Sequence, residues 1–220
     1  MSVLAAIALV VMGFVFAGQS AGAAVDIGVR EELRQLGSTW RQLALAVDWL
    51  AEPVGAVVVL GTCVLLFLRA RNRFAAVLVV VAPAAVVVVT TGMKPLTGRT
   101  INDGFLAFPS GHTAFLAAVA LVVTLSVARR LVVVMVVTLA AGLAMAWAQV
   151  LLNAHYPTDT LGGFCVTLAV VPVVVLALDR IWTVASRAAP AAADDRPDGN
   201  PLPARGGAPA VPPSPSATHD

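Results

Sequence analysis

The chain has 220 residues, of which 59% are apolar and only 12% are charged, and its mean hydropathy is +0.90. Water-soluble domains carry about 45–50% apolar and about 25% charged residues, so this composition argues against a soluble enzyme and against a disordered protein. The net charge of +2 provides no broad basic surface, and we expect no nucleic-acid partner. Membrane lipids must therefore surround most of the chain.

Apolar runs of about the length that crosses a bilayer follow one another along the chain. They cover 3–18, 53–68, 74–92, 112–128, 131–152 and 159–178. Open strands cannot satisfy their backbone hydrogen bonds in lipid, so these valine-rich runs predict helices. The first run ends in small residues like those of a signal-peptidase site but lacks a positive start, and we interpret it as an uncleaved helix. We expect an all-α, polytopic membrane helical bundle of about six transmembrane helices.

Arginines cluster in the segments that should share one face of the membrane. They are Arg69, Arg71, Arg73, Arg129, Arg130, Arg180 and Arg187. Because an excess of arginine and lysine marks cytoplasmic loops, this face is predicted to be cytoplasmic. The outer face of a bacterial-type plasma membrane would then carry residues 19–52, 93–111 and 153–158.

Residues 19–52 differ from the apolar runs because they carry charges beside an apolar stripe. The stripe consists of Leu33, Leu36, Trp40, Leu43, Val47 and Leu50, at helical spacings of three and four. We interpret it as an outer interfacial helix, with a substrate-gating lid as the alternative. Residues 1–187 would form one membrane-embedded domain, and the proline- and alanine-rich residues 188–220 a disordered cytoplasmic tail.

The second half of the predicted bundle has few ionisable side chains, and they gather in two outer segments. These groups are Lys94, Arg99, Asp103 and Asp159, with His112 and His155 beside them. Alone, Lys94 would be a snorkelling anchor and His112 an ordinary helix-end histidine. As a set they indicate a functional site at the outer face, because ionisable groups near the membrane core are costly.

The first outer segment has the features of a phosphate site. Lys94 and Arg99 supply positive charge, and an arginine fork can bind two phosphate oxygens. Ser110 is a natural N-cap for the helix that follows, and Gly111 allows close approach to the backbone. Free N–H groups at a helix start, with the helix dipole behind them, bind anions.

The second outer segment adds a nucleophile. Pro157 suits the first position of the last helix, which places Asp159 in its first turn, four residues after His155. A carboxylate there would orient the imidazole and raise its nucleophilicity. Asp103 and Asp159 are the only acidic residues in the two segments, too few for a magnesium site, so we expect no metal and no cofactor.

These segments resemble the type-2 phosphatidic acid phosphatase family, which includes vanadium haloperoxidases and lipid pyrophosphate phosphatases. The matching residues are Lys94 with Gly98-Arg99, then Pro109-Ser110-Gly111-His112, then His155-Tyr156-Pro157-Thr158-Asp159. Their order and spacing match the family pattern over roughly residues 53–180, and the family's integral-membrane members have six spans.

The resemblance implies a hydrolase that acts on a lipid phosphate or pyrophosphate, such as an isoprenoid pyrophosphate or phosphatidic acid. His155 would attack phosphorus and form a phosphohistidine, Asp159 would orient it, and His112 would protonate the leaving oxygen. The phosphoryl oxygens would be held by Lys94, Arg99, Ser110, Gly111 and Gln149.

Two segments depart from the family pattern. Ile101-Asn102 replaces an Arg-Pro pair, and Ala148-Gln149 replaces a Ser-Arg pair. Gln149 offers only neutral hydrogen bonds, so one charge that would stabilise the transition state is missing. The alternatives are therefore a catalytically weak or silent lipid-phosphate-binding protein and a lipid phosphotransferase. A transporter is disfavoured because the polar groups cluster at one face.

Overall fold

The computed structural model describes residues 2–102 and 104–194, with side chains up to residue 186. Residues 1–183 form one compact unit, and residues 184–220 form a second. The helices are α1 (Ser2–Val15), α2 (Ala24–Arg34), α3 (Ser38–Trp49), α4 (Pro53–Arg69), α5 (Arg73–Thr97), α6 (Gly111–Val127), α7 (Leu131–Leu151) and α8 (Pro157–Asp194). Two short strands, β1 (Thr100–Ile101) and β2 (Phe105–Leu106), pair antiparallel.

Three helices of the described chain, α5, α7 and α8, are long and apolar enough to cross a membrane. The pair α3 and α4, bent by 60°, passes the same test as one span. The apolar helices α1 and α6 have only 14 and 17 residues, and 17 residues extend about 26 Å against about 30 Å of hydrocarbon. The all-α membrane bundle is confirmed, while the number of six spans stays a prediction.

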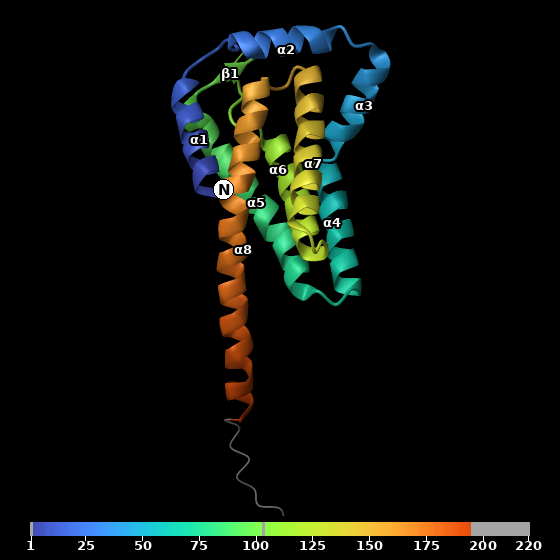
Figure 1. Cartoon of the computed structure of the whole chain (residues 1–220), viewed down its shortest axis with the longest axis vertical. Helices are drawn as coiled ribbons and strands as arrows, with labels where there is room; N and C mark the ends of the chain where they lie inside the picture. Colours follow the sequence, from blue (N-terminus) through green and yellow to red (C-terminus); the bar gives the residue numbers. More distant parts are fainter. Residues whose placement is uncertain (1, 103, 195–220) are drawn as a thin grey trace, which may run out of the picture. The chain divides into compact units, whose positions relative to one another are not determined.

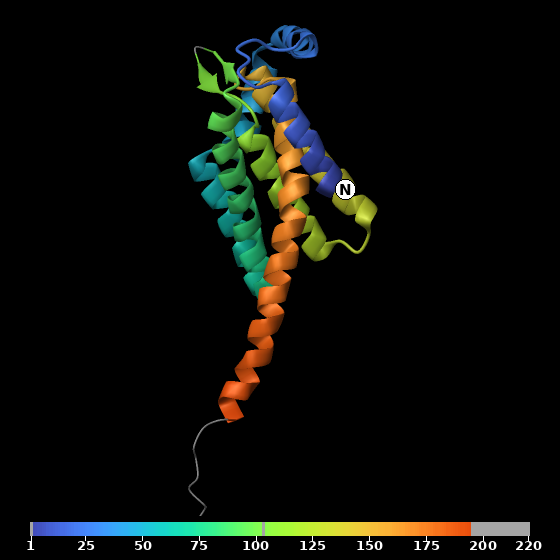
Figure 2. The ribbon, with the colours of Figure 1, turned by 90° about the vertical axis from the view of Figure 1, so that its left-hand side faces the viewer.

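The connections between helices lie at two ends of the first unit. Figure 1 shows the turns from α4 to α5 and from α6 to α7 at the lower end, and α2, β1 and the start of α8 at the upper end. Figure 2 shows the same separation from the side. The lower turns contain Arg71 and residues 128–130, and the upper connections contain the proposed site segments.

The structure corrects two predictions at the ends of the domain. Residues 19–52 do not form one striped helix, because α2 ends at Arg34 and α3 begins at Ser38. The two parts contact different partners, since α2 lies over the upper end and α3 packs along α7. At the other end, α8 continues to Asp194, beyond residue 187 where the tail was expected to begin. The rest of the predicted tail lies outside the described residues.

Paired glycines bring α8 against the segment that precedes α6. A Cβ at Gly163 would meet the Ser110 carbonyl oxygen, and one at Gly162 would meet the Phe108 ring, each well inside 3.0 Å. Phe108 is fully buried in the main core, and Thr167 on α8 donates to the Ala114 carbonyl on α6 at 2.8 Å. The missing side chains at 162 and 163 therefore allow the starts of α6 and α8 to meet.

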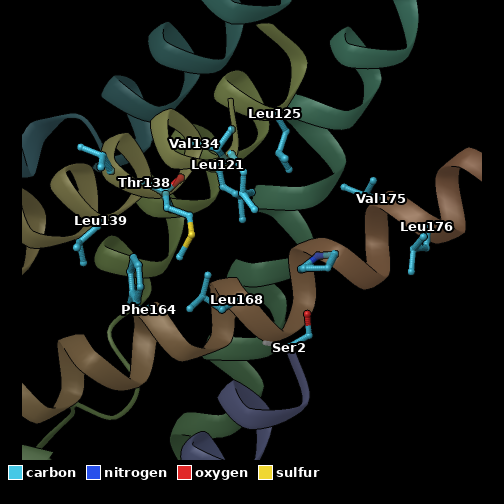
Figure 3. A pocket seen from close by; sticks show the side chains of 14 residues that line it. Ser2, Leu121, Leu125, Val134, Thr138, Leu139, Phe164, Leu168, Val175 and Leu176 are labelled. Atoms are coloured by element: carbon cyan, nitrogen blue, oxygen red, sulfur yellow. The ribbon is translucent and has the colours of Figure 1, made fainter. Parts of the chain in front are cut away.

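An apolar pocket of about 560 Å³ lies between α6, α7 and α8. Figure 3 shows Leu121 and Leu125 of α6 facing Phe164 and Leu168 of α8 across it. None of the sequence-predicted site residues lines this pocket. Its lining suits an apolar chain and offers no group for catalysis.

The orientation in the membrane can be tested by cysteine labelling. In a background with Cys63 and Cys165 replaced by alanine, we expect an impermeant maleimide to label Phe105→Cys on intact cells, because residue 105 is 73% exposed on β2. Arg130→Cys, in the α6–α7 turn, should react only after permeabilisation. The reverse labelling pattern would overturn the orientation.

The close contact between α8 and Ser110 predicts that Gly163→Ala is destabilising. A methyl group there must displace backbone, and overpacking of this kind costs about 1–3 kcal/mol. The apparent midpoint of thermal unfolding in detergent should fall by several degrees, roughly what such a cost produces. The control is Gly61→Ala on α4, where nothing lies within 4 Å of the new methyl group. An unchanged midpoint for Gly163→Ala would contradict the close packing.

Candidate active site

The starts of α6 and α8 are tied together by a backbone hydrogen bond. The Ser110 N–H donates to the Asp159 carbonyl oxygen at 2.9 Å. Ser110 is the N-cap of α6, and its fully buried hydroxyl accepts from the Thr113 N–H. The predicted cap is confirmed, and so is the start of α8 at Pro157. Two helix N-termini therefore meet at one point, and their dipoles favour negative charge there.

His155 lies in the turn between α7 and α8 and is only 7% exposed. Its backbone N–H donates to the Gln149 carbonyl at 3.3 Å, as does the Ala154 N–H at 2.9 Å, so the end of α7 sets its position. Its Nδ1 lies 3.7 Å from Asp159 Oδ2 and has no hydrogen-bond partner among the described residues.

Burial is the main influence on the protonation of His155. Burial lowers the pKa of His155, the charge on Asp159 opposes that shift, and the positive charges of Lys94 and His112 add to it. The imidazole is therefore neutral at pH 7, with Nδ1 on the side of Asp159. A neutral imidazole in this orientation has its Nε2 lone pair available for attack on an electrophile.

Asp159 is fully buried and uses its two carboxylate oxygens differently. Oδ1 accepts from Arg99 Nη1 at 2.6 Å, and Oδ2 accepts from the Tyr156 N–H at 2.9 Å while facing His155. Because one oxygen binds a guanidinium, the carboxylate is fixed in place next to the histidine. Asp159 thus links a buried cation to His155.

The structure gives Arg99 a different role from the one expected from the sequence. We expected Arg99 to bind phosphate, but its side chain is fully buried and its Nη atoms donate to Asp159, Thr158 and Asp26. Rings cover it as well, with Phe16 at 4.1 Å and Tyr156 at 4.7 Å from the guanidinium carbon. Arg99 therefore binds carboxylates and faces no open anion site in this structure.

Asp26 is a residue that the sequence analysis missed. It lies in the first turn of α2 and is fully buried. Its carboxylate accepts from Arg99 Nη2 at 2.8 Å and from the Thr158 N–H and hydroxyl, each at 2.9 Å. The only signal in the sequence was indirect: Arg99, near apolar runs, requires a counter-ion from another segment.

His112 belongs to a second group of polar side chains. It is the second residue of α6, and its Nε2 lies 3.4 Å from Glu52 Oε1 and 3.7 Å from Asp48 Oδ1. Gln149 is buried on α7 and donates its amide N–H to the Asp48 carboxylate. Asp48 lies near the end of α3 and Glu52 is the N-cap of α4, in a segment that we had assigned to the interface and not to the site.

This second group corrects the statement that the site has too few carboxylates for a cation. Three possible metal ligands, one atom from each residue, lie within 4.8 Å of one another in Asp48, Glu52 and His112. In the described part of the chain this is the one group of three or more His, Cys, Asp or Glu side chains so close together. The spacing would fit a cation, yet the carboxylates also serve as ion-pair partners of His112. The expectation of a metal-free site therefore becomes a matter for experiment.

Lys94 and Gly111 complete the set of predicted residues. Lys94 lies in the last turn of α5, half-buried, close enough to His155 for its charge to act on that imidazole. Gly111 is the first residue of α6, and a Cβ there would lie 3.5 Å from Thr90 Oγ1, so packing alone does not require glycine. The structure thus brings Lys94, Ser110, His155 and Asp159 to one end of the bundle, with His112 beside them.

The similarities to known proteins agree with this geometry. A family model described as the PAP2 superfamily matches residues 88–182, which contain Lys94, both site histidines and Asp159. No curated protein matches the chain in sequence. The fold is similar to the crystal structure of the first transmembrane PAP2 type phosphatidylglycerolphosphate phosphatase from Bacillus subtilis. The TM-score is 0.60 at 15% identity, over 81% of this chain and 96% of that one.

The matched segment starts in α5 and ends in α8, so it contains the whole candidate site apart from the contributions of α2 and of residues 48–52. The shared membrane fold extends well beyond that segment. Residues 88–182 thus match the PAP2 superfamily, and the chain has an all-α integral-membrane fold similar to that of this PAP2 type phosphatase.

Proposed function

We propose that the protein hydrolyses the phosphate or pyrophosphate group of a membrane lipid at the outer face, through a phosphohistidine and without a metal. The observation that carries this proposal is the buried His155, with its Nδ1 toward the Asp159 carboxylate and with Lys94 and His112 nearby. A nucleophile, an orienting carboxylate, a cation and a second imidazole are the groups that phosphoryl transfer requires.

In the first step His155 Nε2 attacks phosphorus, and the bond from phosphorus to the lipid oxygen breaks. Protonated His112 gives its proton to that oxygen, which leaves as the lipid alcohol or monophosphate. Positive charge forms on His155 in this step, and Asp159, 3.7 Å from its Nδ1, stabilises that charge. The product is a phosphohistidine together with a neutral His112.

In the second step His112 takes a proton from a water molecule, which attacks phosphorus and displaces His155. Inorganic phosphate leaves, and both histidines return to their starting states. The phosphoryl oxygens are held by Lys94, by the N–H groups at the start of α6 around Ser110 and Gly111, and by the dipole of that helix. Glu52 and Asp48 lie 3.4 and 3.7 Å from His112 Nε2, the atom that would carry the transferred proton.

The lipid nature of the substrate is supported by an apolar cavity beside the site. This cavity of about 420 Å³ is lined by Thr113 and Pro157, neighbours of the site residues, and by apolar side chains of α2, α7 and α8 such as Leu33, Leu143 and Phe164. A hydrocarbon chain placed there would gain the free energy of apolar burial while its phosphate reached the start of α6. Isoprenoid and diacyl chains both fit this description.

A catalytically silent lipid-phosphate-binding protein is the second candidate. It is favoured by the commitments of the polar groups: Gln149 donates to Asp48, and Arg99 donates to Asp26 and Asp159. Lys94 then remains the main positive charge for phosphate at the site. Loss of a single oxyanion-binding group typically lowers turnover about 10²–10³-fold. A measurement of turnover therefore distinguishes a slow phosphatase from a silent binding protein.

The histidine mechanism predicts a clear order of activities. Purified protein in detergent should release phosphate from at least one of phosphatidic acid, phosphatidylglycerophosphate or an isoprenoid pyrophosphate. His155→Ala should abolish release, because it removes the proposed nucleophile, whereas His112→Ala should slow it by about 10²–10⁴. Vanadate should inhibit, and a chelator should not. The control is His219→Ala, in the C-terminal segment.

Two results would decide against this mechanism. Full activity of His155→Ala would remove the nucleophile from the proposal. Loss of activity with a chelator and recovery with magnesium would transfer the chemistry to a cation held at Asp48, Glu52 and His112. Phosphate binding without release by the wild-type protein would support the silent binding protein.

The apolar cavity predicts a chain-length effect on binding. Ala146→Phe, on α7 in the cavity lining, should raise KM for long-chain lipid phosphates about tenfold or more. It should leave KM for a short, water-soluble phosphate ester unchanged, because such an ester does not enter the cavity. Val137→Phe is the matched control, since Val137 lies on the same helix, 41% exposed, and lines neither apolar cavity. Equal KM changes for both substrates would contradict the assignment of the cavity.

A further inference from the structure

A row of three buried charges connects α2 to the proposed nucleophile. Asp26, Arg99 and Asp159 are each 0% exposed, and the guanidinium lies between the two carboxylates at 2.8 and 2.6 Å. Asp159 then faces His155 at 3.7 Å. The row carries one net negative charge, so the end that faces His155 remains anionic.

The contacts of Arg99 leave its guanidinium with one orientation. Its Nη2 donates to Asp26, and its Nη1 donates to Asp159 and Thr158. The aromatic rings of Phe16 and Tyr156 lie against the guanidinium. Phe16 and Asp26 both come from the N-terminal part of the chain, before the segment matched by the family model. The N-terminal part thus supplies the surfaces that fix the guanidinium on the side away from Asp159.

The same part of the chain binds the turn that carries His155. Arg30 and Arg34 of α2 donate to the side-chain oxygen of Asn153, two residues before His155. Asn153 in turn donates to Asn102 Oδ1 at 2.9 Å, next to β1. Helix α2 therefore contacts the turn before α8 through Asn153, and it contacts the first turn of α8 through Thr158.

From this geometry we infer that Asp26 is a positioning residue for the reaction: it fixes Arg99, which holds Asp159 toward His155, so that α2 is part of the catalytic apparatus. The inference rests on the proposed nucleophilic role of His155. It gives α2 a task beyond that of an interfacial cap, and it gives Arg99 a task other than phosphate binding.

Removal of the Asp26 charge should change the pKa of His155 in one direction. A negative charge stabilises protonated imidazole, and a positive charge destabilises it. Asp26 partly cancels the positive charge of Arg99. Replacing Asp26 by neutral asparagine would leave more positive charge near His155, so the pKa of His155 should fall further and the imidazole should stay neutral to lower pH.

Several charged or titratable groups act on His155 besides Asp26. They are Asp159 of α8, Lys94 of α5 and His112 of α6. Arg99 contacts Asp159, and Asp48 and Glu52 lie beside His112. The side chain of Asp26 contacts Arg99 and Thr158, and it contacts neither His155 nor Asp159. A substitution at Asp26 therefore changes how Asp159 is positioned without removing a group that takes part in the proposed reaction.

The test compares Asp26→Asn with Glu31→Gln, which removes a carboxylate from an exposed position of the same helix. In Asp26→Asn we expect kcat for lipid phosphate to fall at least about tenfold through misplaced Asp159, with KM unchanged. The acid limb of the kcat/KM profile should move to lower pH by about half a unit. Glu31→Gln should match the wild-type protein in all three measurements.

Two further variants and a spectroscopic measurement make the result decisive. Asp26→Glu keeps the charge, so its acid limb should stay in place while kcat falls. Thr158→Val removes one Arg99 contact without a change of charge, and it should behave like Asp26→Glu. The titration of His155, followed by NMR of histidine-labelled protein and assigned with His155→Ala, should show the same shift in Asp26→Asn without requiring activity.

The inference is overturned if Asp26→Asn lowers only the unfolding midpoint, with kcat and the His155 titration unchanged in the folded protein. If Asp26→Asn does not fold, unchanged kcat in Thr158→Val and Asp26→Glu overturns it. Failure of the proposed function would appear differently, as wild-type activity in His155→Ala or as no activity in the wild-type protein, while the NMR titration would still measure the coupling to Asp26.

Discussion

The burial of one arginine between two carboxylates is the interaction on which the outer end of the protein depends. An unpaired buried charge costs several kcal/mol, so Arg99 cannot keep its place unless Asp26 and Asp159 both keep theirs. The three residues come from α2, from the segment after α5 and from the first turn of α8. Local helices can form without this contact, but their outer ends cannot assemble into one site. The apolar bundle beneath supplies most of the stabilising free energy, and the buried ion pairs determine which ends meet.

At the end of the bundle that carries His155, few charged side chains are present among the described residues, and backbone groups at two helix ends favour negative charge. The N-termini of α6 and α8 meet through the Ser110–Asp159 hydrogen bond, and their free N–H groups and dipoles point toward the same region. Glycines 162 and 163 make this meeting possible, because any side chain there would meet the Phe108 ring or the Ser110 carbonyl. Most other members of the site hold or orient groups: Asp159 faces the nucleophile, Gln149 holds Asp48, and Glu52 lies against His112.

The features that the sequence could predict are those with local patterns. Hydropathy predicted the apolar helices, and the residue types at 110 and 157 predicted where α6 and α8 begin. Contacts across many residues left no such pattern. Asp26 and Arg99 are 73 positions apart, and Gln149 and Asp48 are 101 apart. The stripe over residues 33–50 was interpreted as one helix because its spacing is regular, whereas Gly37 caps the start of a second helix in a new direction. Arg99 was assigned to phosphate because a carboxylate partner from α2 has no sequence signature.

The short length of α6 has a mechanical consequence for a protein in lipid. With 17 residues, α6 is about four residues shorter than α7, beside which it packs. A hydrophobic helix shorter than the hydrocarbon layer draws the bilayer thinner around it. Because Ser110 ties the start of α6 to the first turn of α8, a tilt of α6 that relieves this mismatch would also load the turn that carries Asp159. For the reaction proposed here, membrane thickness would then influence the alignment of His155 and Asp159, and the composition of the surrounding lipids would affect the rate.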